Sequence, residues 1–266
     1  MEYWAKRQLE MQKAIENKTV KDTEKQIHKY YKRAMNKVLD DFEATYDKLI
    51  AAATEGRTPT PADLYKLDRY WKMQKHLKEE LQKLGDKEVA FLSRQFELEW
   101  QYIYNSVSIP SEIAFSTVSN ANANMMINTV WLADGKTFSQ RVWDNVNKLT
   151  QTLNDNLIHC VVTGKKTTEL RKLLVERFDV SRHQANTLIR TEVAHIKTEA
   201  AKQRYMDYGI TRYEYLADPD ERTCEGHSKS CEALDGKIFK YSEMQAGVNA
   251  PPMHPNCRCA IVPVIE

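Results

Sequence analysis

The chain has 266 residues, and its 39 basic and 37 acidic side chains leave a formal net charge of +2. This length suits one large domain or two smaller ones, and the scarcity of glycine and proline argues against disorder along the whole chain. The nearly balanced charge gives no overall electrostatic case for binding nucleic acid or an anionic membrane.

The N-terminal residues lack the apolar run of a secretory signal, and no segment approaches the ~20 apolar residues that cross a bilayer. We therefore expect the protein in the cytoplasm, where disulfides are disfavoured. This expectation bears on the 5 cysteines, because only Cys160 precedes residue 220. Cys160 lies in a helical apolar context and is interpreted as a core residue.

Apolar residues at steps of three and four predict a long helix over residues 22–53. Thr60 and Pro61 then read as the N-cap and first position of a second helix, which we expect Gly85 to end. A third helix is predicted from residue 86 to about residue 105. Together they indicate an antiparallel helical bundle or an extended helical arm. The stripe of the first helix consists of Ile27, Tyr31, Ala34, Val38, Phe42, Thr45 and Leu49.

The stretch 106–132 is less decisive, because its asparagine-rich part around residues 120–124 is a poor helix former. A domain boundary is placed near residues 133–135. A helix is then predicted over residues 139–160, with Gly164 ending it. Its apolar face consists of Val142, Val146, Leu149, Leu153 and Leu157.

A short helix is predicted at residues 168–177, followed by a separate helix that ends near residue 208. Ser181 and Gln184 have the spacing of a capping box, so Ser181 is expected to begin this second helix. Glu192 falls near the centre of its apolar stripe at 100° per residue. A carboxylate there requires a partner, because burying it alone costs several kcal/mol.

After Gly209 the period changes to short alternating segments, which predict strands at residues 212–216, 237–241 and 261–265. Asp235 and Gly236 give a tight-turn signal before the second of these, and Pro263 confines the third to an edge. The predicted fold is mainly α, with a helical N-terminal bundle or arm and a small α+β C-terminal module.

Three regions are predicted on this basis. Residues 1–134 form a helical N-terminal region, residues 135–209 a helical core, and residues 210–266 a metal-binding α+β module. In the last region a hairpin held by a metal ion would bring distant cysteines together. A module of this size lacks the apolar core to fold alone, and metal binding would supply that free energy.

Cysteine and histidine gather in this C-terminal region in the pattern of a metal site. Zinc takes four nitrogen or sulfur ligands, usually as two close pairs from separate segments. The spacing favours Cys231, His254 and Cys257 as three of the ligands. Cys224 and Cys259 are alternatives for the fourth ligand, and His227 is a less favoured candidate. The five candidate ligands are Cys224, Cys231, His254, Cys257 and Cys259.

Two alternatives to a metal site stay open, which are thiols in a small core and a disulfide pair. A reducing cytosol favours metal. Mixed cysteine and histidine ligands without a redox motif favour zinc over iron. The chain lacks a His-Glu-x-x-His motif and the nucleobase-deaminase motif, so a structural zinc is predicted and no catalytic residue is assigned.

The triplet Arg190-Thr191-Glu192 is the second constellation of interest. It is interpreted as a buried helix anchor formed by Arg190 and Glu192, with Glu192 held by an arginine such as Arg222 or by backbone amides. The alternative is an acid–base or substrate-orienting triplet beside the metal module.

Five short motifs follow one another in the second half of the chain, and their combination is more specific than any one of them. It closely resembles the Mu F-like family of phage minor head proteins, also called head morphogenesis proteins, over residues 143–264. The gap between Cys224 and Cys231 is longer than is common in that family, which puts Cys224 in doubt as a ligand. The motifs are Leu188-Ile189-Arg190-Thr191-Glu192, Tyr208-Gly209-Ile210, Asp220-Glu221-Arg222-Thr223-Cys224, Leu234-Asp235-Gly236-Lys237 and Pro251-Pro252-Met253-His254-Pro255-Asn256-Cys257-Arg258-Cys259.

The resemblance implies a virion protein inside a phage head, present in the host cytoplasm during assembly, and not an enzyme. Family members look like low-copy head components near the portal, and some are implicated in handling DNA at packaging and ejection. The implied partners are the portal protein and capsid or scaffold components, with phage DNA as a further candidate and no membrane span.

Two other functions remain open. One is a metal-dependent nucleic-acid enzyme such as a nuclease, with Glu192 or His254 near the metal. The other is a free-standing DNA-binding protein, for which lysine-rich helix faces are candidate surfaces. Aromatic residues on the helices are candidate interface anchors if exposed. These basic and aromatic candidates are Lys25, Lys29, Lys32, Arg33, Tyr30, Tyr31, Tyr70, Trp71, Trp100, Tyr102 and Tyr104.

Overall fold

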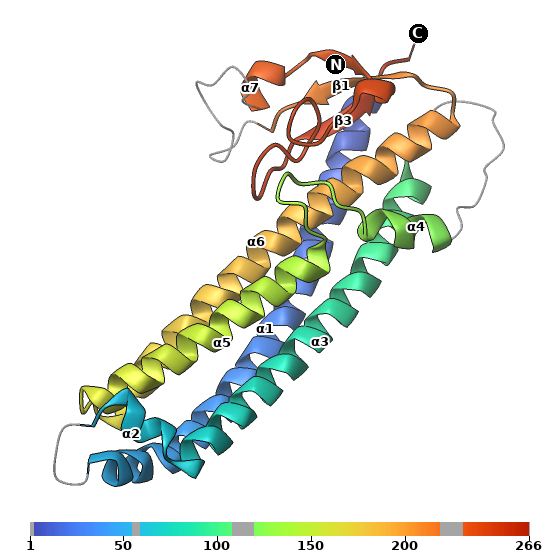
Figure 1. Cartoon of the computed structure of the whole chain (residues 1–266). Helices are drawn as coiled ribbons and strands as arrows, with labels where there is room; N and C mark the ends of the chain where they lie inside the picture. Colours follow the sequence, from blue (N-terminus) through green and yellow to red (C-terminus); the bar gives the residue numbers. More distant parts are fainter. Residues whose placement is uncertain (1–2, 55–58, 108–119, 219–230, 266) are drawn as a thin grey trace. The chain divides into compact units, whose positions relative to one another are not determined.

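The computed structural model describes residues 3–54, 59–107, 120–218 and 231–265 of the chain. Most of these residues are helical, and a small antiparallel sheet forms near the C-terminal end (Figure 1). The predicted fold class, mainly α with a small α+β C-terminal module, is therefore confirmed. The elements in chain order are α1 (Tyr3–Thr54), α2 (Pro61–Tyr65), α3 (Asp68–Ser106), α4 (Asn120–Ile127), α5 (Phe138–Val162), α6 (Thr167–Asp207), β1 (Arg212–Leu216), α7 (Cys231–Leu234), β2 (Ile238–Lys240), the 3-10 helix η1 (Tyr241–Glu243) and β3 (Ala260–Pro263).

The chain divides into two compact units, each built from segments that are far apart in sequence. Unit 1 comprises Met1–Glu24, Phe91–Ser139 and Asn186–Glu266, and unit 2 comprises Lys25–Ala90 and Gln140–Ala185. The long helices α1, α3 and α6 therefore contribute residues to both units. The boundaries of the three predicted regions stay a prediction, because compactness alone does not define a domain.

Unit 2 is a helical bundle in which segments of α1, α3, α5 and α6 run side by side (Figure 1). Its helices form because apolar residues recur every three to four positions and so gather on one face. The predicted stripe of α5 is buried throughout, and that of α1 is buried except at the half-buried Thr45. At the start of α2, the Thr60 backbone N–H donates to Asp63 Oδ2 at 2.9 Å, as expected of an N-cap residue.

The predicted helix stop at Gly85 is wrong, because α3 continues through it to Ser106. A Cβ at Gly85 would lie 2.6 Å from Cζ3 of Trp143, so the missing side chain makes room for an indole ring. Gly85 therefore serves close helix packing and not helix termination. Gly164, by contrast, ends its helix as predicted, with a φ of 64° just after α5.

The predicted break before Ser181 is also wrong, because α6 is continuous from Thr167 to Asp207. Ser181 does not cap a helix. It is buried, and its hydroxyl donates to Asn145 Oδ1 at 3.0 Å, while the Asn145 amide donates to the Ser181 carbonyl oxygen at 3.0 Å. A hydrogen bond to α5 thus replaces the local one that the capping-box spacing suggested.

The sheet belongs to unit 1 and has the strand order β2-β1-β3, with both pairs antiparallel. The bounds of β1 agree with the predicted strand, and Pro263 lies in an edge strand as predicted. β1 is the central strand, and its side chains Tyr213, Tyr215 and Leu216 are buried. This central position brings β1 beside the segments that carry the C-terminal cysteines.

Two further outcomes concern the helices. Asparagine-rich residues 120–127 form α4, although their composition disfavours a helix. No helix in the described ranges combines the length and apolar character that a membrane crossing requires.

Among the aromatic candidates for interface anchors, Trp71 and Tyr102 are exposed and Tyr30 is half-buried. Tyr31, Tyr70, Trp100 and Tyr104 are core residues.

Candidate metal centre

Three cysteines from two separate segments meet in the C-terminal part of unit 1. Cys231 is the first residue of α7, and Cys257 and Cys259 lie just before β3. All three are buried, and their sulfur atoms lie within 4.8 Å of one another. They are the one such group of potential metal ligands among the residues that the structure describes. Three of the five candidate ligands thus lie together, and their binding of a metal ion stays a prediction.

The spacing of the sulfur atoms suits a tetrahedral ion. Zinc–sulfur bonds of about 2.3 Å in a tetrahedron place neighbouring sulfur atoms about 3.8 Å apart. The sulfur atoms, within 4.8 Å of one another, lie at most about 1 Å further apart than that geometry requires. Their surroundings are mostly apolar, because Leu234 belongs to the same buried cluster, Phe239 and Met253 pack against it, and the Tyr215 ring completes it. The donor set and its dry environment therefore fit a structural metal ion.

The thiols also influence one another. Hydrogen bonds with Cys231 and then Cys259, followed by burial, raise the pKa of the Cys257 thiol. A cation among the three sulfur atoms has the opposite effect, because it stabilises thiolates and displaces their protons. Metal affinity at such a site is consequently expected to fall as the pH is lowered.

A tight turn over His254-Pro255-Asn256-Cys257 presents the second pair of cysteines. The Cys257 backbone N–H donates to the His254 carbonyl oxygen at 3.1 Å, which closes the turn. Asn256 has a φ of 60°, in the left-handed region. Proline followed by a residue with positive φ is typical of a type II turn. This local geometry explains why Pro-Asn precedes Cys257.

The remaining candidate ligands are placed less favourably. His254 is half-buried, stands outside the three-thiol group, and has its Nδ1 atom 2.9 Å from the Pro255 carbonyl oxygen. Cys224 and His227 lie outside the described residues, as does Arg222. The choice among the three candidates for the fourth ligand stays a prediction. Cys160 is buried on α5 in unit 2, as its apolar context predicts.

The triplet Arg190-Thr191-Glu192 lies on α6, and each member contacts a different segment of unit 1. Arg190 makes two hydrogen bonds to Glu24 of α1, at 2.6 and 3.1 Å. The Thr191 hydroxyl accepts a hydrogen bond from the Asn256 backbone N–H at 3.2 Å. Thr191 thus ties α6 to the turn that presents Cys257.

Glu192 is buried at 3% exposure, and its Oε2 atom accepts a hydrogen bond from the Trp131 indole N–H at 3.0 Å. The ring of Trp131 stacks on His195, one helical turn after Glu192, with centroids 4.1 Å apart. The sequence pattern required a partner for Glu192 but did not identify Trp131. No local signal links residues 61 positions apart.

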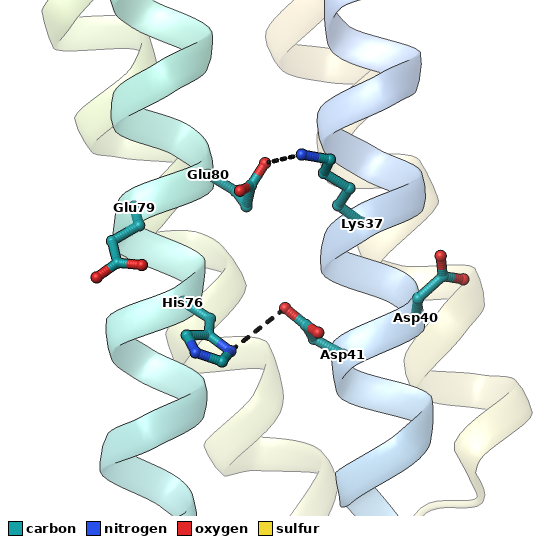
Figure 2. A pocket seen from close by; sticks show the side chains of 6 residues that line it. All are labelled: Lys37, Asp40, Asp41, His76, Glu79 and Glu80. Atoms are coloured by element: carbon teal, nitrogen blue, oxygen red, sulfur yellow. Dashed lines mark ion pairs between the residues drawn. The ribbon is translucent and has the colours of Figure 1, made fainter.

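A second concentration of ionisable groups lines a surface hollow of about 360 Å³ in unit 2 (Figure 2). Lys37 pairs with Glu80 at 3.1 Å and His76 approaches Asp41 at 3.7 Å, as the dashed lines of Figure 2 mark. The acidic groups and His76 do not form a ligand group within 4.8 Å, in contrast to the three cysteines. We assign no metal to this hollow.

Comparisons with known proteins give one family and two relatives. An uncharacterized protein of Haemophilus influenzae (strain ATCC 51907 / DSM 11121 / KW20 / Rd) is 26% identical over 167 residues, or 62% of this chain and 32% of that protein. The NAD(+)--arginine ADP-ribosyltransferase EFV of Enterococcus faecalis (strain ATCC 700802 / V583) is 26% identical over 148 residues, or 50% of this chain and 29% of that protein. The chain spans about a third of the length of these curated relatives. No solved structure matches it.

The family match covers the region in which the site was found. Residues 151–262 match the family described as Phage Mu protein F like protein. The matched region contains the triplet on α6 and the three clustered cysteines. Over residues 151–262 the chain is therefore similar to the phage Mu protein F like family, the family that its motifs resemble.

Proposed function

We propose that the protein is a minor head protein of a phage or prophage that acts in head morphogenesis. The observation that carries the proposal is the family match over residues 151–262, which contains the buried cysteine cluster and the triplet that anchors α6. On this proposal the protein resides inside the phage head and passes through the host cytoplasm during assembly.

The proposal includes a structural zinc ion bound by Cys231, Cys257 and Cys259, with a fourth ligand from among Cys224, His254 and His227. Three buried thiolates favour a soft or borderline metal, and the absence of a redox motif favours zinc. The surrounding sheet has strands of three to five residues, so a metal ion would supply folding free energy that the local core lacks.

The proposed role is structural and not enzymatic. A catalytic zinc keeps one position open to solvent, whereas these three thiols are buried among apolar side chains. The transferase activity named for the Enterococcus relative is not extended to this chain, because the alignment covers 29% of that protein and the name describes all of it. DNA cleavage by the purified protein with an added divalent metal, abolished by Glu192→Ala, would contradict this part of the proposal.

The proposed partners are the portal protein and capsid or scaffold components, with phage DNA as a further partner. Support for DNA is confined to the basic side chains Lys25, Lys29, Lys32 and Arg33 of α1, all of which are exposed. Binding through these residues would weaken steeply with salt, because neutralised phosphates release counterions.

Elemental analysis of the purified full chain tests the metal centre. We expect one zinc per chain in the wild type and in Cys160→Ser, and its loss in Cys231→Ser and Cys257→Ser. Cys160→Ser is a matched control, since it also replaces a buried cysteine but lies on α5 outside the cluster. Zinc-free wild-type protein would contradict the proposed centre.

The virion assignment needs a separate test. Purified phage particles are expected to contain the protein at low copy number, and a tagged chain is expected to co-purify with the portal protein during assembly. Particles that form normally and lack the protein altogether would contradict a role in the head.

A further inference from the structure

Tyr215 places a phenol group at the cysteine cluster. It lies on β1, the central strand of the sheet, and its side chain is 0% exposed. It belongs to the same buried cluster as Cys231, Cys257 and Cys259. No sequence motif singled out this residue, because a tyrosine in an alternating strand is most simply read as a core residue.

The backbone of Tyr215 is fully paired, but its hydroxyl is not. The Tyr215 backbone N–H donates to the Lys237 carbonyl oxygen, and the Tyr215 carbonyl oxygen accepts from the Gly236 N–H, both at 2.9 Å. The hydroxyl makes no hydrogen bond of standard geometry with any described residue. Leaving a buried hydroxyl without a partner costs about 1–3 kcal/mol. A buried donor of this kind calls for an acceptor nearby.

The sulfur atoms of the cysteine cluster are the nearby acceptors for the Tyr215 hydroxyl. The thiols of Cys231 and Cys259 lie within hydrogen-bonding reach of the Tyr215 hydroxyl. A phenol keeps its proton at neutral pH, so the Tyr215 hydroxyl is available as a donor. A neutral thiol is a weak acceptor, whereas a thiolate bound to a metal carries charge and accepts a much stronger hydrogen bond.

We propose that Tyr215 is a positioning residue of the metal centre, whose hydroxyl donates a hydrogen bond to the metal-bound thiolate of Cys231 or Cys259. The inference rests on the proposed zinc site and names a residue that supports it. The hydrogen bond satisfies the buried donor, orients the sulfur ligand and withdraws part of its charge. Such supporting partners typically change metal affinity 10–100-fold when they are removed.

The test compares Tyr215→Phe with Tyr213→Phe in the full chain. Tyr213 is a matched control because it is also buried on β1, while its hydroxyl donates to the Asn249 carbonyl oxygen at 3.2 Å, away from the thiols. Each substitution removes one hydroxyl and keeps the ring. Zinc affinity is measured by competition with a chelator, and Co²⁺ is used as a spectroscopic probe of the same site.

We expect Tyr215→Phe to bind zinc roughly 10–100-fold more weakly than the wild type, with Tyr213→Phe close to the wild type. In the Co²⁺ form, the sulfur-to-metal charge-transfer absorption should move to lower energy in Tyr215→Phe alone, because a thiolate without its hydrogen bond is richer in electrons. This band would not respond to a purely structural role of the hydroxyl.

The outcomes separate this inference from the proposed function. A wild-type chain that binds neither zinc nor Co²⁺ would contradict the metal centre itself. Binding by the wild type with unchanged affinity and spectrum in Tyr215→Phe would overturn only the role of Tyr215. Complete loss of the one-to-one complex in a folded Tyr215→Phe would also overturn it, because the phenol would then be a direct ligand.

Discussion

Asn256 adopts a backbone conformation that most side chains avoid. Its φ of 60° lies in the left-handed region, where a residue with a Cβ is strained by about 1–2 kcal/mol. Asparagine tolerates this region better than other residues that carry a Cβ, and glycine has no such strain. The turn before Cys257 thus depends on the residue type at position 256.

Substitution of Asn256 should therefore follow backbone preference. We expect Asn256→Gly to keep the zinc stoichiometry and stability close to the wild type, and Asn256→Val to lower the free energy of unfolding by roughly 1–3 kcal/mol. Denaturant unfolding and zinc content measure both effects. If glycine were as damaging as valine, the asparagine side chain and not the backbone would be responsible.

Glu88 is a buried carboxyl group in unit 2. It is 0% exposed, and neither of its carboxylate oxygens makes a hydrogen bond of standard geometry with a described residue. Burial raises the pKa of Glu88 to about 7, and the nearby Tyr31 hydroxyl opposes this only in part. The Tyr31 hydroxyl itself accepts a hydrogen bond from the Asn145 amide at 2.9 Å. Burial thus favours the neutral form of Glu88.

A pH dependence of stability follows from Glu88. The folded chain retains a proton on Glu88 that the unfolded chain loses near its ordinary pKa of 4.5, so stability should fall between about pH 4.5 and about pH 7. The loss is on the order of 3 kcal/mol at 1.36 kcal/mol per pKa unit. Glu88→Gln should remove this part of the decline, as measured by denaturant unfolding at pH 5 and pH 8. A variant with the wild-type pH slope would refute this assignment.

At the residue scale, the burial of a side chain was more predictable from the sequence than its hydrogen-bond partner. The helical period placed Glu192 on the apolar stripe, and the carboxyl is indeed buried. Its hydrogen bond from Trp131 joins segments 61 residues apart, which no local pattern encodes. Cys231, Cys257 and Cys259 were among the five candidate ligands because cysteine and histidine in such spacing have a recognisable chemistry, whereas Tyr215 has no comparable signature.

At the element scale, the predictions failed where tertiary packing overrides local preference. Glycine usually weakens or ends a helix, yet α3 continues through Gly85, where the Trp143 ring occupies the space that a side chain would need. Likewise, Ser181 does not cap a helix despite its capping-box spacing, because its hydroxyl donates to Asn145 on α5. The strand β1 was predicted with its observed bounds, since alternation of side chains is a local property.

The Gly85–Trp143 contact can be tested by Gly85→Ala. Alanine has a helix propensity about 1 kcal/mol better than glycine, but its Cβ would lie 2.6 Å from Trp143 Cζ3. We expect the steric clash to outweigh the gain in helix propensity, so that Gly85→Ala lowers the free energy of unfolding by about 1–3 kcal/mol. Thermal and denaturant unfolding measure this. The loss should shrink when Trp143→Leu is combined with it, and a more stable Gly85→Ala single variant would contradict the packing role.

At the scale of the whole molecule, the two units differ in what holds them together. Unit 2 has a continuous apolar core along its helices, including the fully buried stripe of α5. The C-terminal part of unit 1 has a three-stranded sheet and a small cluster in which three of the five buried members are cysteines. Ordering that segment by its own apolar burial is difficult, since short sheets are marginal without a further constraint.

Removal of the proposed metal ion should therefore act locally. We expect a strong chelator to speed amide hydrogen exchange in β1, β3 and the turn before Cys257, including the Tyr215 N–H that donates to Lys237. Amides of α5 should retain their protection, and most of the helical circular dichroism should remain, because the bundle core contains no proposed ligand. Hydrogen exchange with mass spectrometry gives both readouts in one experiment. Unchanged protection around the cysteines in chelator, with zinc shown to be absent, would mean that the cluster is an ordinary core of thiols.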